Sequence, residues 1–211
     1  MIITAIRPAK GHRVTLIFSD GTDVSIDKTT WEESPYGVGS SLSCQEAEAL
    51  CADSERRRAE SKAVFLLSKR DLSRRELEQK LCREKGRYRP ESREAAAAAA
   101  EKMEELGYVD DEAYAHRLAE RMAKEKLYPT RRITEELIRK GIGKELAKEA
   151  AECLGLDETE MALAFLAKKR YTVPQNAKDA QRIAAALARF GYGSDVVRRA
   201  MRQWGEELPD E

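Results

Sequence analysis

Arginine side chains are the residues of this chain whose type and spacing best suit contact with a charged partner. They occur as runs or pairs at four places, 56–58, 74–75, 131–132 and 198–199. A guanidinium group binds phosphate or carboxylate through two parallel hydrogen bonds, which suits either a nucleic-acid backbone or an acidic protein groove. Arg75 and Arg131 stand at equivalent places near the starts of two similar helical segments. The pairs therefore predict a negatively charged partner, although charges of both signs also simply solvate helices.

The motifs that signal catalysis are missing from the sequence. It contains no glycine-rich phosphate loop, no Gly-x-Ser-x-Gly and no His-Glu-x-x-His. With only His12 and His116, acid–base and nucleophile–base schemes have few groups to use. The paired acids Asp110-Asp111 and Glu135-Glu136 point in different directions on a helix, which favours turn or capping roles over cation binding. We therefore expect no catalytic residue, no cofactor and no enzyme.

Four cysteines raise the question of a structural metal. The closest two, Cys44 and Cys51, lie seven residues apart, and no Cys-x-x-Cys is present. Zinc ligands usually come in closely spaced pairs because a short loop must wrap one ion. The spacing predicts no metal site, and Cys82 and Cys153, which fall in helical patterns, are expected to be small buried hydrophobes.

Composition favours many thin helical layers over one thick core. Hydrophobic residues make up 42% of the chain, charged residues 36% and aromatic residues only 6%. No apolar run approaches the roughly 18 residues needed to span a bilayer. The first ten residues lack a basic segment followed by an apolar stretch, so they do not form a secretory signal. We expect a cytoplasmic protein.

Charge is divided unevenly along the chain although the net charge is zero. Residues 1–55 carry four basic and nine acidic side chains, whereas residues 56–205 carry 34 basic and 25 acidic ones. The last six residues add four acids. A basic helical body of this kind favours an anionic partner.

The first thirty residues predict a small antiparallel meander. Val14, Leu16 and Phe18 alternate with Thr15 and Ile17, which is the period of a strand. Asp20-Gly21 is a strong signal for a tight turn, and the alternation resumes after it, while residues 2–6 can add a third strand. A loop is expected over 33–43, before Ser43 and Glu46 open a helix as a capping box.

From residue 46 onward the sequence predicts helices in a repeated arrangement. Leu77/Leu81/Gly86 matches Ile133/Leu137/Gly141 with one residue inserted, and Gly141 and Gly191 lie 50 residues apart in similar strings. Ser73 and Glu76 have capping-box spacing, Pro90 and Pro129 suit first helical turns, and the alanines at 95–100 predict a closely packed helix. The expected parts are a meander and linker (1–45), a first repeat with a lead-in helix (46–111), a second (112–158), a third (159–205) and an acidic tail (206–211).

The predicted fold class is therefore mainly α. Three tandem three-helix repeats of about 45–55 residues would form an elongated curved array behind the β meander.

Three strings resemble the signature of the RecX regulators. They are Leu66-Leu67-Ser68-x-Arg70-x-x-Ser73-x-x-Glu76-Leu77-x-x-Lys80-Leu81, Leu106-Gly107-Tyr108-Val109-Asp110-Asp111-x-x-Tyr114-Ala115 and Arg132-Ile133-x-x-Glu136-Leu137-x-x-Lys140-Gly141-Ile142. The similarity runs over about residues 60–145 and more weakly to about 204. One departure concerns the turn before the central helix, where the family often has Gly-Pro and this chain has Pro129-Thr130.

The resemblance implies a partner, the RecA recombinase assembled as a filament on single-stranded DNA, and a place in DNA repair, recombination and the SOS response. Family members lodge in the filament groove and generally limit the recombinase, ATPase and co-protease activities. We expect a monomer that contacts the filament, or the backbone of single-stranded DNA weakly and without sequence preference, through Arg70, Arg75, Arg131, Arg132 and Lys140. The apolar motif residues are expected in the core, namely Leu66, Leu77, Leu81, Tyr108, Tyr114, Ile133 and Leu137.

Two other functions fit the same residues. One is a helical module whose main ligand is nucleic acid, with weak, salt-dependent contacts to the backbone, because the alanines at 95–100 offer base edges no donors or acceptors. The other is a protein-interaction scaffold with an unrelated partner. Tight binding to bare single-stranded DNA would favour the first, and binding that depends on assembled RecA would favour the filament.

Overall fold

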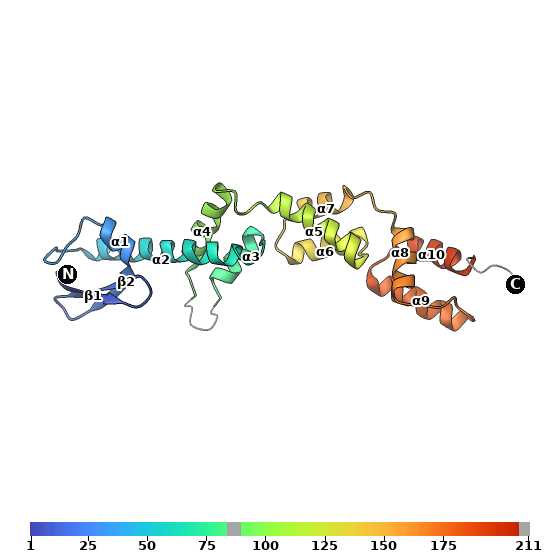
Figure 1. Ribbon diagram of the computed structural model, residues 1–211, viewed down its shortest axis with the longest axis horizontal. Coiled ribbons are helices and arrows are strands. Elements are labelled where there is room, and N and C mark those ends of the chain that lie inside the picture. Colours follow the sequence, from blue (N-terminus) through green and yellow to red (C-terminus); the bar gives the residue numbers. More distant parts are fainter. Residues whose placement is uncertain (84–89, 207–211) are drawn as a thin grey trace. The chain divides into compact units, whose positions relative to one another are not determined.

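The computed structural model describes residues 1–83 and 90–206. The predicted stop at Gly86 and all but the first residue of the acidic tail lie outside this range. Within it, a three-stranded sheet precedes ten helices, which confirms the predicted mainly α class (Figure 1). The chain divides into two compact units, Met1–Asp110 and Asp111–Glu211, and each is described by itself.

The predicted meander is an antiparallel sheet with the strand order β1-β2-β3. Its strands are β1 (Ile3–Ala9), β2 (Arg13–Phe18) and β3 (Asp23–Asp27). Val14, Leu16 and Phe18 point to one face, and all three are buried, as the alternation predicts. At the turn between β2 and β3 the Asp20 carboxylate accepts hydrogen bonds from the Thr22 hydroxyl (2.6 Å) and amide (3.0 Å), which lower the pKa of Asp20.

A short helix, α1 (Lys28–Glu33), follows β3 directly and was not predicted. The Asp27 carboxylate caps it by accepting from the amides of Thr29 and Thr30. Six residues are too few to show a helical apolar period, so only the cap could have indicated this helix.

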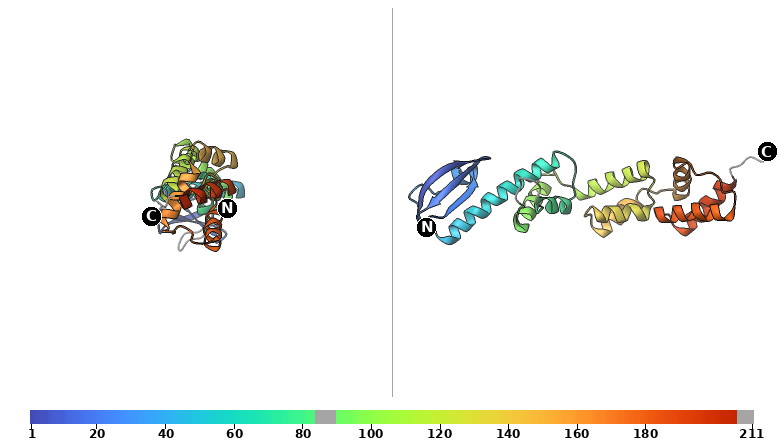
Figure 2. Two further views of the ribbon diagram at one scale, coloured as in Figure 1. Left: turned by 90° about the vertical axis from the view of Figure 1, so that its right-hand side faces the viewer. Right: turned by 90° about the horizontal axis from the view of Figure 1, so that it is seen from below.

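The helix α2 (Cys44–Leu67) links the sheet to the first repeat inside the first unit. The predicted capping box is present, because Ser43 and Glu46 each bond the other's backbone amide. The first half of α2 lies beside the sheet (Figure 2), and its Leu50 packs in the core of the sheet, whereas Ala59 and Ala63 lie in the core of the first repeat. The predicted lead-in helix and the first helix of the repeat are thus one continuous element of 24 residues.

The first repeat consists of the end of α2 with α3 (Arg74–Leu81) and α4 (Arg93–Glu105). Leu77 and Leu81 of α3 are fully buried against the alanines of α4. Ser73 caps α3 and Ser92 caps α4, so Pro90 precedes the helix and the expectation that it opens the first turn was wrong.

Glu91 is the buried acid of the first repeat. Its carboxylate accepts from the Arg58 guanidinium at 2.6 Å and lies 3.7 Å from the Lys62 ammonium group. The Arg58 bond raises the pKa of that guanidinium. This ion pair holds the start of α4 on α2.

Some residues expected in the cores lie elsewhere. Tyr108 is 64% exposed, because the left-handed Gly107 turns the chain at the end of α4 and Val109 takes the buried place instead. Leu66 is only partly buried. Cys153 is exposed and Cys82 half-buried, so the expectation of buried cysteines was wrong for the first.

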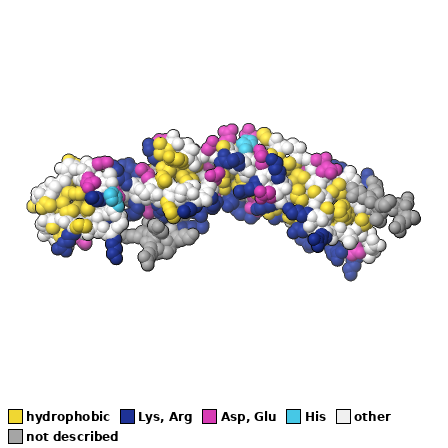
Figure 3. Space-filling model, viewed as in Figure 1, with side chains coloured by type: hydrophobic (Ala, Val, Ile, Leu, Met, Phe, Trp, Pro, Cys, Tyr) yellow, Lys and Arg dark blue, Asp and Glu magenta, His cyan; other side chains and the backbone are white. Residues whose placement is uncertain are grey.

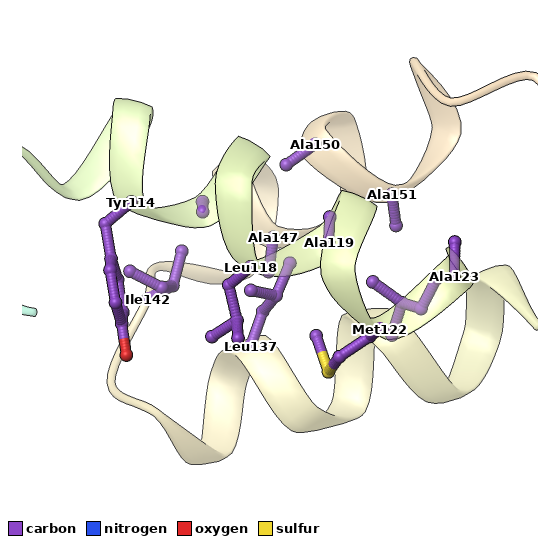
Figure 4. Packing of buried hydrophobic residues seen from close by; sticks show 12 residues of the cluster. Tyr114, Leu118, Ala119, Met122, Ala123, Leu137, Ile142, Ala147, Ala150 and Ala151 are labelled. Atoms are coloured by element: carbon purple, nitrogen blue, oxygen red, sulfur yellow. The ribbon is translucent and has the colours of Figure 1, made fainter. Parts of the chain in front are cut away.

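The second repeat is built from α5 (Asp111–Lys126), α6 (Thr130–Arg139) and α7 (Lys144–Glu152). Leu118 and Met122 of α5 meet Leu137 of α6 in the centre of the bundle, and small alanines of α7 close it from the other side (Figure 4). Tyr114 and Ile142 seal one end of the same core (Figure 4).

The third repeat consists of α8 (Glu158–Lys168), α9 (Ala177–Phe190) and α10 (Ser194–Glu206). Phe165 and Leu166 of α8 pack on Ile183 and Leu187 of α9. The pairs Leu77/Leu81, Ile133/Leu137 and Ile183/Leu187 are all buried at equivalent places, and this confirms the three-helix repeat.

The turn between α5 and α6, where the sequence departs from the RecX signature, contains a residue with an unusual backbone conformation. Leu127 has φ +57°, a left-handed conformation that normally favours glycine, and it ends α5 just before Pro129. Its side chain packs on the core of the third repeat.

Candidate partner-binding surface

Arg75 and Arg131 occupy the same position in two repeats. Each is the second residue of its helix, α3 and α6, and each follows a buried helix start at Ser73 or Pro129. Arg75 is exposed and makes no ion pair with any residue that the structure describes. Arg131 is 82% exposed, and its Nε lies 3.1 Å from the carboxylate of Glu135. Solvated pairs of this kind contribute little, so both guanidinium groups are available to a partner.

Arg70 and Lys140 have more local roles. Arg70 donates to Glu76 at 2.5 Å, and this pair ties the turn after α2 to the first turn of α3. Lys140 is the half-buried C-cap residue of α6, and its amide bonds the carbonyls of Glu136 and Leu137. Both side chains lie beside helix ends instead of on an open helix face.

Arg132 is directed into the junction between the second and third repeats. Its Nη1 donates to the Phe190 carbonyl at 2.8 Å. Its guanidinium carbon lies 4.1 Å from the centre of the Tyr128 ring and 4.5 Å from that of Phe190. Cation–π contact with two rings stabilises such a group by about 1 kcal/mol per ring. Arg132 therefore joins two repeats, and a partner contact by it stays a prediction.

Other groups join the same two repeats. The Tyr192 hydroxyl donates to the Leu127 carbonyl at 2.7 Å, and burial together with the charge of Glu158 raises the pKa of this hydroxyl. Lys168 donates to the Glu125 carbonyl at 2.7 Å, and the Thr130 amide donates to Glu158 at 2.8 Å. We refer to these contacts with those of Arg132 as the repeat junction.

A hollow on the first unit carries charges of both signs. It has a volume of about 450 Å³, lies between α2 and α4 and is lined by Asp53, Arg56, Arg57 and Lys102 among others. Its charges pair with each other or with neighbours: Asp53 binds Arg56 and Arg57, and Lys102 lies 3.2 Å from Glu105. Most of the charged side chains that line this hollow are therefore paired.

Within the described ranges, no three His, Cys, Asp or Glu side chains gather closely enough to hold a metal ion. No helix in that part of the chain is both long and apolar enough to cross a bilayer.

Comparison with known proteins gives a family match for the second repeat and whole-protein relatives for most of the chain. A family model described as RecX, second three-helix domain, matches residues 110–150. The regulatory protein RecX of Trichlorobacter lovleyi is 33% identical over 146 residues, which cover 65% of this chain and 89% of the relative. The regulatory protein RecX of Stenotrophomonas maltophilia is 34% identical over 143 residues, covering 67% of this chain and 83% of the relative. The chain belongs to the RecX family.

Solved RecX structures share the fold of this family member. A crystal structure of regulatory protein RecX matches with a TM-score of 0.67 at 20% identity and covers 95% of this chain and 98% of its own. RecX from Lactobacillus salivarius matches with a TM-score of 0.60 at 21% identity, covering 71% of this chain and 96% of its own. The relatives are named regulatory proteins and not enzymes.

Of the five predicted contact residues, two lie on open and equivalent helix starts. The sequence did not single out Ile138, an apolar residue that is 41% exposed on α6, three residues beyond Glu135. An exposed isoleucine on an amphipathic helix is visible only once the buried side of that helix is known.

Proposed function

We propose that this protein regulates RecA by binding its filament on single-stranded DNA and limiting the recombinase, ATPase and co-protease activities. It would act in the cytoplasm as a monomer and without chemistry of its own. Membership of a family of regulatory proteins supports this proposal most directly.

The contact surface that we propose starts at Arg75 and Arg131. Both are exposed at the second position of a helix, and one lies in each unit. A filament presents the same surface on every subunit, so two equivalent weak contacts can act together through effective concentration. Ile138, on the same helix as Arg131, offers an apolar contact that a protein partner would bury.

The test measures RecA ATPase and strand exchange on single-stranded DNA with this protein below the stoichiometry of RecA. The unchanged protein should inhibit both activities and sediment with the filaments. Arg75→Glu with Arg131→Glu should weaken filament binding by about tenfold to a hundredfold, because each reversal removes a charge-assisted contact and adds repulsion.

Lys148→Glu is a matched control, since Lys148 is 66% exposed on α7 and lies outside the proposed surface. Circular dichroism should show full helix content for all variants. The proposal fails if the unchanged protein neither sediments with filaments nor alters either activity. The residue assignment alone fails if the Lys148 variant is as weak as the double variant.

A further inference from the structure

A row of basic side chains runs along α9 in the third repeat. Lys178, Arg182 and Arg189 follow the spacing i, i+4 and i+11, which places them on one face of the helix over roughly 16 Å. All three are exposed, and Arg182 lies 3.5 Å from Asp179. Lys178 and Arg189 have no ion-pair partner among the residues that the structure describes. We call these three residues the α9 row.

The other exposed residues of α9 are uncharged, and most of them have small side chains. Apart from the row, its exposed residues are Ala177, Gln181, Ala185 and Ala188. The one acid of the helix, Asp179, lies at the helix start, where its carboxylate accepts a hydrogen bond from the Asn176 side-chain amide at 3.1 Å. Figure 3 shows Lys and Arg side chains along the lower edge of the second unit, where Figure 1 places α6 and α9.

Comparison with α6 shows what is particular to this helix. When Gly141 is aligned with Gly191, Glu135 and Glu136 of α6 correspond to Ala185 and Ala186 of α9. In α6 the two acids pair with Arg131 and Arg139. In α9 the arginine that corresponds to Arg139 is Arg189, and it lacks such a neighbour. Thus α9 keeps the cations at the places of Arg132 and Arg139 and lacks the two acids, while an uncharged glutamine, Gln181, stands at the place of Arg131.

The same alignment explains why the side chain of Arg182 is exposed to solvent. It corresponds to Arg132, which the repeat junction holds between two rings, and Lys178 corresponds to Tyr128, one of those rings. In the third repeat this position faces solvent, and the side chain of Arg182 is 68% exposed.

We propose that the α9 row binds the phosphate backbone of a nucleic-acid strand. Successive phosphates form a line of negative charge that a line of cations matches, and arginine and lysine are the side chains that neutralise it. A protein partner would bury an aromatic or large apolar anchor, and none is exposed on α9. The alanines between the cations offer no donors to base edges, so binding is independent of sequence. This surface is distinct from Arg75 and Arg131 and goes beyond the RecA contact proposed above.

The experiment measures fluorescence anisotropy of a labelled 30-nucleotide oligo-dT strand with the full chain over a range of salt concentrations. The variant Lys178→Ala, Arg182→Ala, Arg189→Ala should bind at least about tenfold more weakly at low salt. Each phosphate contact on a single strand contributes about 0.7 to the slope of log affinity against log salt, so the slope should fall by about 2. Alanine favours helix, so the fold should be kept, and circular dichroism checks this.

A control variant removes the same charge elsewhere in the second unit, with Arg121→Ala, Lys124→Ala and Lys148→Ala on the exposed faces of α5 and α7. It should keep most of the affinity and slope. The proposal is overturned if both triple variants lose equally, or if the α9 variant binds the strand like the unchanged protein. Loss of filament binding with unchanged binding to bare oligo-dT would make the row a protein contact and also overturn it. Filament sedimentation of the Arg75/Arg131 variant reports separately on the proposed function.

Discussion

The hydroxyl of Tyr192, in the third repeat, forms a hydrogen bond with Leu127, a residue with a strained backbone in the turn between α5 and α6 of the second repeat. The side chain is buried, and its hydroxyl donates to the carbonyl of Leu127, whose backbone is left-handed. A left-handed residue other than glycine costs roughly 1–2 kcal/mol, which must be offset by contacts around it. The hydrogen bond and the packing of the Leu127 side chain are those contacts.

Removing this hydroxyl should lower stability and change its dependence on pH. We expect Tyr192→Phe to reduce the free energy of unfolding by about 1–2 kcal/mol, because the Leu127 carbonyl loses its partner. Burial raises the native pKa of Tyr192, so above about pH 10 only the unfolded tyrosine ionises and the native state loses stability as pH rises. The variant should lack this part of the loss. Urea unfolding near pH 7.5 and 10.5 measures both effects, with the exposed Tyr108→Phe as a control that should change neither.

Two neighbouring arginines show how far the sequence could assign a site. Arg131 and Arg132 look alike in the sequence, yet the first is exposed and the second lies between two aromatic rings. Successive helical residues point about 100° apart, and the Phe190 carbonyl that Arg132 binds is 58 residues away. Local spacing could find basic residues near a helix start, but it could not show which of them an internal contact already uses.

Helix ends in this molecule depend on glycines with left-handed backbone, and two of them differ in their surroundings. Gly107 has φ +73° after α4, and an added Cβ would have no heavy atom within 4 Å. Gly191 has φ +117° after α9, and an added Cβ would lie 3.2 Å from Cβ of Arg132 and 3.4 Å from Cγ of Pro129. The second glycine is needed for close approach as well as for conformation.

The two sites should respond differently to the same substitution. We expect Gly107→Ala to cost about 1 kcal/mol from backbone strain alone. Gly191→Ala should cost more, about 2–3 kcal/mol, because φ +117° suits an L residue less and the methyl group pushes α6 away from α9. Thermal or urea unfolding of both variants gives the comparison. Equal losses would mean that the approach of α6 to Gly191 contributes nothing to stability.

Elements with a local signal could be predicted from the sequence. The alternation of Val14, Leu16 and Phe18 fixes a strand, and pairs such as Ile133 and Leu137 before a glycine fix a helix and its end. The short α1 and the continuity of α2 escaped prediction. The helix α1 has too few residues to show a helical period of apolar residues. No local signal marks the point along α2 where its contacts change from the sheet to the first repeat.

At the scale of the whole molecule, the two units are held together internally in different ways. In the first, one continuous helix, α2, serves both the sheet and the first repeat. In the second, two separate three-helix cores meet through Leu127 and Met161 and through the repeat junction. The cohesion of the second unit therefore depends on side chains from both repeats.

Breaking the junction should uncouple the two repeats of the second unit. In the unchanged protein we expect amides of α6 and α9 to become exposed to exchange together. In Arg132→Ala the helices of the third repeat should open at lower free energy than those of the second, by about 1–2 kcal/mol, because two ring contacts and a hydrogen bond are lost. Hydrogen–deuterium exchange with mass spectrometry measures this, and Arg131→Ala should leave the pattern unchanged. Uniform exchange in the Arg132 variant would contradict the prediction.

The repeat junction also bears on whether the repeats are interchangeable modules. Within it, Tyr128 and Arg132 belong to the second repeat, and Phe190, whose ring and carbonyl Arg132 contacts, belongs to the third. If the third repeat were duplicated, the added copy would follow the original third repeat. The phenylalanine of the added copy would then meet Lys178 at the place where Phe190 now meets the ring of Tyr128. The repeats are therefore not interchangeable although their cores are similar, because the residues that join them fit only one order of the repeats.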